Sequence, residues 1–152
     1  MKTENKLQGF LFWFYCLVML WLLLGRVPAP LVEPYPDLLK GNLNLEPLHT
    51  IGNYLKVIRN HNMTYYHQAI VNLAGNVILF IPLGWFLPRV FPRLGRLWKV
   101  LLVAALAIGC IELIQLLTLR GSFDVDDFIL NLPGVSIGYG IHKLTHKRNI
   151  TE

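Results

Sequence analysis

The chain has 152 residues, of which 54% are hydrophobic and only 15% are charged. Soluble domains usually carry about 25% charged residues, so this composition argues against an ordinary soluble protein and favours an integral membrane protein. Fourteen Lys and Arg residues against nine Asp and Glu residues give a net charge of +5. In a membrane protein such an excess usually encodes orientation, so we expect no nucleic-acid partner.

The first apolar run covers residues 9–25 and contains no charged side chain. Its length is close to the roughly 20 residues that a membrane-spanning helix needs. Lys2 and Lys6 precede it, which is also the arrangement of a signal peptide, with Val27-Pro28-Ala29 as the cleavage pattern. Because the run exceeds the roughly 7 to 15 apolar residues of a signal peptide, we predict a retained membrane anchor.

Residues 26–68 are polar and contain five prolines, which predicts an outer loop on one membrane face. Within this loop, residues 42–58 could form one short amphipathic turn or helix. The second predicted span, residues 69–87, is apolar and has Pro82 near one end, where a kink or a helix exit is tolerated. Residues 88–99 follow as a short loop that holds four basic and no acidic side chains.

The third predicted span, residues 100–119, is uncharged except for Glu112. The fourth, residues 128–142, is short and interrupted by Pro133, so we expect it to cross with its flanks counted or to lie partly inside the bundle. Together these segments predict an all-α integral membrane protein. It is expected to be a single domain, residues 1–152, built as a bundle of about four transmembrane helices.

The distribution of basic residues predicts the orientation of this bundle. Nine of the fourteen Lys and Arg residues lie in the two terminal tails and in the loop 88–99. Basic residues in short loops mark the cytoplasmic side of a membrane. Four spans place these segments on one side, so both termini and the loop 88–99 are predicted to be cytoplasmic. The loop 26–68 and the turn 120–127 then face outward.

Polar side chains interrupt the second, third and fourth predicted spans in pairs. The members of each pair are three or four residues apart, so they share one helix face. At about 1.5 Å of rise per residue, the pairs all lie in the outer third of the bilayer, and we predict that they line one polar pocket that opens outward. The candidate pocket residues, with the turn beside them, are Asn72, Asn76, Glu112, Gln115, Arg120, Asp124, Asp126, Asp127 and Asn131.

Burying Glu112 in a span costs about 2.5 to 3.5 kcal/mol on insertion scales, so this residue needs a partner or a function. Arg120, two turns further along, is the expected ion-pair partner. The alternative for the whole set is that these polar side chains only hold helices together, with an aspartate of the turn acting as a helix cap. No calcium-loop spacing is present, so we predict neither a metal nor a cofactor.

Gly134 and Gly138 form a stripe of small residues on the fourth predicted helix. Such stripes let helix backbones approach closely. We expect this stripe to pack the fourth helix against a neighbouring helix, and the alternative is a homodimer through the same two glycines.

Several motifs occur in a fixed order over about residues 42–140. They are Asn44-Leu45-Glu46-Pro47, the block from Asn72 through Gly75-Asn76, Phe80 and Pro82 to Gly84, then Glu112 with Gln115, and finally Asp124, Asp126, Asp127, Asn131 and Gly134. In this order and spacing the chain resembles the VanZ-like proteins, and it departs from their pattern at Leu48 and at Leu132-Pro133, where a kink is expected. The resemblance implies a small multi-pass protein of the bacterial cytoplasmic membrane. It also implies a link to reduced susceptibility to teicoplanin-type lipoglycopeptides, with which the founding member is associated.

The pocket and the resemblance lead to three functional hypotheses. In the first, the pocket binds the polar head of a membrane lipid of the envelope, a lipid-linked cell-wall precursor or an amphipathic glycopeptide, and the protein contributes to teicoplanin-type resistance. In the second, the protein is an intramembrane acid/base enzyme in which Glu112 acts with Asp124 or Asp127 on a lipid-linked substrate. In the third, it is a structural or assembly membrane protein. We favour the binding role over the enzyme.

Overall fold

A computed structural model describes residues 2–28, 30–61 and 63–151, with side chains described for residues 6–28, 30–61 and 63–145. Ala29, which belongs to the possible cleavage pattern, lies outside the described residues. The side chains of Lys2, Lys147 and Arg148, which count in the orientation of the bundle, also lie outside them.

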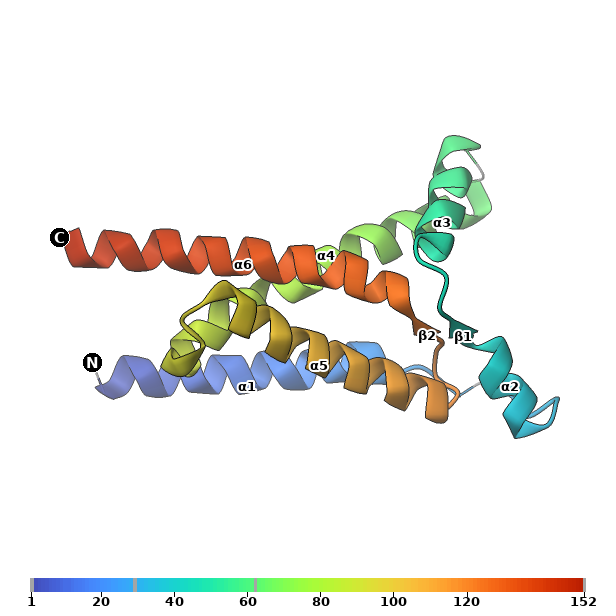
Figure 1. Cartoon of the computed structure of the whole chain (residues 1–152), viewed down its shortest axis with the longest axis horizontal. Coiled ribbons are helices and arrows are strands. Elements are labelled where there is room, and N and C mark those ends of the chain that lie inside the picture. Colours follow the sequence, from blue (N-terminus) through green and yellow to red (C-terminus); the bar gives the residue numbers. More distant parts are fainter. Residues whose placement is uncertain (1, 29, 62, 152) are drawn as a thin grey trace.

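The described part of the chain contains four long helices, α1 (Lys2–Leu24), α4 (Met63–Val90), α5 (Leu97–Leu117) and α6 (Val125–Thr151). A short 3₁₀ helix, η1 (Pro92–Leu94), joins α4 to α5. Helices α1 and α5 run in one direction and α4 and α6 in the other, so both ends of the chain lie at the same end of the molecule (Figure 1). The bundle is therefore helical throughout its length, as the sequence predicts.

Three of the described helices are long and apolar enough to cross a membrane, within Lys6–Leu24, Met63–Val90 and Leu97–Leu117. Their outer faces carry large apolar side chains, such as Trp21 at 72% exposed and Phe10 at 67%. Contiguous exposed apolar surface of this kind is rare on soluble proteins and fits a lipid environment. The prediction of an all-α integral membrane protein is confirmed.

Helix α6 contains the fourth predicted span, residues 128–142, but it is not among these three helices. Asp126 and Asp127 occupy its first turn, and Asn131 lies one turn further in. These side chains lower its hydropathy, so α6 needs a protein neighbour more than the other long helices do. The helix continues through Pro133.

Three glycines hold α6 directly against α4. A Cβ atom built at Gly134 would overlap the carbonyl oxygen of Val77, and one at Gly138 would overlap that of Ile81. From the other side, a Cβ at Gly84 would overlap the carbonyl oxygen of Val135. The glycine stripe therefore packs against a neighbouring helix of the same chain, and a homodimer through it would require α4 and α6 to separate.

Apolar side chains from all four long helices meet in the centre of the bundle. Phe80, Val100, Ala104, Ile108 and Val135 are at most 1% exposed there. Helix α1 joins this core less tightly, through Phe12 and Met19. This packing fixes the positions of the polar side chains that lie one or two turns nearer the end of the bundle.

The predicted outer loop, residues 26–68, is largely helical. It contains α2 (Tyr35–Gly41), a short strand β1 (Leu43–Asn44) and the amphipathic helix α3 (His49–Arg59). Strand β1 pairs in parallel with β2 (Phe123–Asp124), with Asn44 opposite Asp124. All of these elements lie at the end of the molecule opposite the two termini (Figure 1), and they close that end of the bundle.

Helix α5 ends in a Schellman motif. The backbone N–H of Arg120 donates to the carbonyl of Gln115 at 2.9 Å, and that of Leu119 donates to Leu116 at 3.1 Å. Leu119 takes the left-handed conformation, with φ of 53°, that glycine usually supplies at this position. The turn directs the chain back across the end of the bundle toward β2.

Candidate functional site

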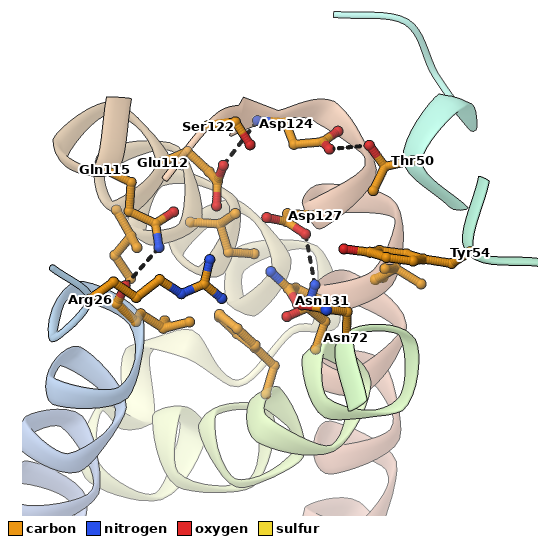
Figure 2. Close-up of a pocket in the computed structure, with 16 residues that line it drawn as sticks. Arg26, Thr50, Tyr54, Asn72, Glu112, Gln115, Ser122, Asp124, Asp127 and Asn131 are labelled. Carbon is orange, nitrogen blue, oxygen red and sulfur yellow. Dashed lines mark hydrogen bonds between the residues drawn. The ribbon is translucent and has the colours of Figure 1, made fainter. Parts of the chain in front are cut away.

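A pocket of about 270 Å³ lies at the end of the bundle that α3 covers. The ends of α1 and α5 and the first halves of α4 and α6 surround it (Figure 2). Three pairs of polar side chains that the sequence places on separate helix faces all reach it. Seven of the nine candidate residues line the pocket: Asn72, Asn76, Glu112, Gln115, Asp124, Asp127 and Asn131.

The carboxylates of Glu112 and Asp127 point toward one another inside the pocket (Figure 2). Glu112 accepts a hydrogen bond from the backbone N–H of Asp124 at 3.0 Å. Asp127 accepts one from the side-chain amide of Asn76 at 2.7 Å. The two carboxyl groups also share a side-chain hydrogen bond with each other. A carboxylate has about four lone-pair sites, so each group still keeps part of its accepting capacity.

Asn131 lies on the same wall, one turn after Asp127 on α6. Its side chain is 4% exposed, and its amide oxygen has no hydrogen-bond partner among the described residues. The large majority of buried side-chain polar atoms in proteins have a partner. This oxygen is therefore an open acceptor beside two carboxylates that are also acceptors.

Gln115 and Arg120 tie the end of α5 to the end of α1. Gln115 donates to the carbonyl of Leu23 at 2.8 Å, and Arg120 donates to that of Leu24 at 2.7 Å. A cation at the C-terminus of a helix is favoured by the helix dipole. The expected ion pair between Arg120 and Glu112 is wrong: Arg120 does not line the pocket, because the Schellman turn points it at α1.

Asp126 also lies outside the pocket, where it stabilises the fold. It is fully buried, and its carboxylate accepts hydrogen bonds from the backbone N–H groups of Leu48 and Ile51. These amides belong to the first turn of α3, which has no side-chain cap of its own. Asp126 therefore caps α3 from a distant part of the chain and holds it over the pocket.

Asp124 combines both positions, since it lines the pocket and also ties the covering elements together. Its carboxylate accepts from Thr50 on α3, from Asn44 on β1 and from the backbone N–H of Asp126. The last of these bonds is that of a helix N-cap. Asp124 is therefore the helix cap that the sequence predicts in this turn, since it caps α6, whereas Asp126 caps α3.

Four polar lining residues were not predicted: Arg26, Thr50, Tyr54 and Ser122. The guanidinium of Arg26 points into the pocket opposite Asp127 (Figure 2), yet no ion pair within 4.0 Å joins it to any described carboxylate. Arg26 is the first cation after the apolar run, which is a usable sequence signal. Thr50 and Tyr54 are spaced four residues apart in the amphipathic segment, and that pattern was a signal as well.

Tyr54 faces the carboxylates from α3 (Figure 2). Burial raises the pKa of its hydroxyl, and the negative charge of Asp127 raises it further. The group therefore stays a neutral phenol that can donate a hydrogen bond. In the part of the chain that the structure describes, no group of three or more His, Cys, Asp or Glu residues is arranged to hold a metal ion.

The sequence model of the VanZ/LLP1 family matches residues 12–146. The chain is also 28% identical, over 133 residues, to a protein from Enterococcus faecium named Protein VanZ, and the match covers 88% of this chain and 71% of that protein. No solved structure matches the chain. With its apolar helices, this chain is a multi-pass bacterial membrane protein that belongs to the VanZ/LLP1 family.

Proposed function

We propose that this protein binds the polar head of an amphipathic molecule of the bacterial envelope in the pocket, and that this binding contributes to teicoplanin-type resistance. The observation that carries the proposal is the unused bonding capacity of Glu112, Asp127 and Asn131 in one pocket. Side chains that serve only to hold helices together use that capacity on neighbouring helices, as Gln115 does. Open acceptors at the end of a bundle are suited to a ligand.

The size of the pocket supports a head group over a whole antibiotic. Pockets that enclose drug-sized ligands have volumes of roughly 300 to 1,000 Å³, and this one has about 270 Å³. A glycopeptide antibiotic is larger than such ligands. We therefore favour a membrane lipid or a lipid-linked cell-wall precursor, with its chains in the bilayer, as the bound molecule.

Membership of the family supports the proposed contribution to teicoplanin resistance. The chain belongs to the VanZ/LLP1 family, and VanZ-like proteins resemble it in the motifs that supply the pocket residues. In this proposal, binding at the outer membrane surface changes how much lipid-linked target the antibiotic can reach. The pocket then faces outward, as the distribution of basic residues predicts.

A teicoplanin susceptibility assay in a sensitive Gram-positive host tests the proposal. The host expresses wild type, Glu112→Gln or Asp127→Asn, with membrane levels matched by quantitative blotting. Both substitutions keep the shape of the side chain and remove its charge. We expect wild type to raise the inhibitory concentration and both variants to return it toward that of the empty host.

The matched control is Asp37→Asn, which makes the same chemical change at an exposed ion pair with Lys40. We expect this variant to protect as well as wild type, because the pocket is untouched. Equal protection by the two pocket variants would contradict a role for the pocket. No protection by wild type at confirmed expression would contradict the resistance role of this chain.

The facing carboxylates of Glu112 and Asp127 favour one second candidate, an acid/base enzyme that acts on a lipid-linked substrate. Paired carboxylates can divide the roles of proton donor and acceptor. This candidate requires that Glu112→Gln abolishes conversion of the lipid while binding remains. Mass spectrometry of the lipids extracted from matched strains distinguishes the two, since a binding protein leaves the lipid composition unchanged.

A further inference from the structure

We propose that the ligand of this pocket is a lipid head that carries a primary ammonium and a phosphate. The ammonium lies among Glu112, Asp127 and Asn131, and the phosphate lies against Arg26. This inference rests on the proposed function, since it names the class of head group that the same pocket takes.

On the pocket wall formed by Glu112, Asp127 and Asn131, the free hydrogen-bonding groups are acceptors, so they favour a ligand that supplies donors. The carboxylates of Glu112 and Asp127 each accept one hydrogen bond from a nitrogen in the described part of the chain. The amide oxygen of Asn131 accepts none there. A primary ammonium has three N–H donors and no acceptor, so it can donate to all three residues at once.

The charges in the pocket favour a cation on this wall. Two carboxylates that face one another repel unless a proton or a cation lies between them. Asp124 adds a third carboxylate to the lining, and Arg26 is the one cationic residue among the lining side chains. Before a ligand binds, a proton in the hydrogen bond between Glu112 and Asp127 reduces their repulsion. An ammonium that binds there displaces this proton to the solvent and takes its place, which a neutral hydroxyl head would not do.

On the side of the pocket where α1 ends, the free donor groups favour a ligand that supplies a hydrogen-bond acceptor. The Arg26 guanidinium points inward from the end of α1 without an ion pair among the described residues (Figure 2). A guanidinium matches the geometry of a phosphate. Arg26 follows the end of α1 and is exposed, which suits a phosphate that remains near the bilayer surface.

Lipid binding to the purified full-length protein tests this proposal. The protein is held in an uncharged detergent with EDTA, and short-chain lipids are titrated by native mass spectrometry. Phosphatidylethanolamine and lysyl-phosphatidylglycerol both carry an ammonium and a phosphate, and comparing them distinguishes two sources of the same chemistry. Phosphatidylglycerol lacks the amine, phosphatidylcholine lacks N–H donors, and dodecylamine lacks the phosphate.

We expect at least one of the two amine-and-phosphate lipids to bind about tenfold more tightly than the other three, as expected for lost charge-assisted hydrogen bonds. Glu112→Gln and Asp127→Asn should remove the preference over phosphatidylglycerol. Arg26→Gln should remove the preference over dodecylamine. Arg59→Gln, which neutralises an exposed cation of α3 outside the lining, should change neither. Thermal unfolding of each variant identifies any variant that fails to fold. The lipid preferences are then compared among the variants that do fold.

Equal affinity for phosphatidylglycerol would overturn the ammonium and leave the proposed function standing. Equal affinity for dodecylamine, with no effect of Arg26→Gln, would overturn the phosphate contact. Binding that appears only when Mg²⁺ or Ca²⁺ replaces EDTA would also overturn the proposal, since a metal ion would then occupy the place of the ammonium. If none of the five probes binds, this inference fails together with the membrane-lipid form of the proposed function, and a lipid-linked cell-wall precursor remains as the ligand of the proposed function.

Discussion

Polar side chains at the end of this bundle fall into two groups. Gln115, Arg120 and Asp126 spend their hydrogen bonds on backbone groups of other elements. Asn131 leaves its amide oxygen open. The first group stabilises the fold, whereas an open buried acceptor costs about 1 to 3 kcal/mol. A residue that is retained at such a cost is a good position at which to separate stability from function.

We predict that Asn131→Leu keeps or raises the stability of the protein and abolishes teicoplanin protection. Leucine has a similar shape and removes the unpaired oxygen, so the desolvation cost of about 1 to 3 kcal/mol disappears. The open acceptor disappears with it. The midpoint of thermal unfolding in detergent and the inhibitory concentration in the host measure the two effects.

Asp126→Asn is the companion variant, because it weakens a fully buried cap of α3 rather than the pocket wall. Its unfolding midpoint should fall, and its protection should fall with its membrane level. A destabilised Asn131→Leu protein would contradict this division and would place Asn131 among the residues that hold the helices together.

At the scale of the elements, the contact between α4 and α6 depends on the absence of side chains. Gly134 and Gly138 bring the backbone of α6 against the carbonyl groups of α4, and Gly84 does the same from α4. This seam places Asn76 of α4 beside Asp127 of α6. The geometry of the pocket wall is therefore set by glycines one or more turns away from it.

We predict that Gly138→Ala lowers the free energy of unfolding by about 1 to 3 kcal/mol, the usual cost of overpacking. The new methyl group overlaps the backbone of α4 and forces the two helices apart. Thermal unfolding in detergent measures the change. Gly140→Ala is the control on the same helix, since a Cβ there meets no atom within 4 Å. Alanine has the higher helix propensity, so Gly140→Ala is expected to keep or raise the stability, and an equal loss in both variants would contradict a specific role of the seam.

At the scale of the whole molecule, we predict that α2 and α3 face outward and that the loop containing η1 faces the cytoplasm. The basic loop 88–99 lies at the same end as both termini, and the pocket lies at the other end (Figure 1). Single cysteine residues introduced at each end of the bundle show which side of the membrane that end faces. Asp37→Cys and Arg93→Cys are made in a background in which Cys16 and Cys110 are replaced by alanine.

A membrane-impermeant maleimide should label Asp37→Cys in intact protoplasts and Arg93→Cys only after the membrane is permeabilised. Both positions are exposed, so a difference in labelling reports the side of the membrane and not burial. The reverse pattern would invert the bundle and turn the pocket toward the cytoplasm, which would contradict the proposed route to resistance.

The sequence predicts the helical class because long apolar runs have few other structures available. It also predicts which faces of three helices converge, since Asn72 with Asn76 and Asp127 with Asn131 follow the helical period. The sequence marks Arg26 as the first cation after the apolar run but does not place it in the pocket, because that depends on how the end of α1 meets helices about 100 positions later. The mistaken pairing of Arg120 with Glu112 has a related cause. Nearness in sequence suggested a contact that a left-handed Leu119 prevents.

The capping of α3 by Asp126 also determines when this helix can be completed during synthesis of the chain. The bond between Leu48 and Asp126 spans 78 residues, so at about 5 to 20 residues per second the ribosome needs roughly 4 to 16 seconds to deliver the second partner. Until then, α3 has been synthesised without its cap, and α4 lacks α6, the helix that packs against it through the glycine seam. Helix α6, the last and the least apolar of the four long helices, therefore completes the cover, the seam and the pocket wall in one late step of biosynthesis. A nascent chain that stops before α6 would expose an uncapped α3 and an unfilled seam to membrane proteases.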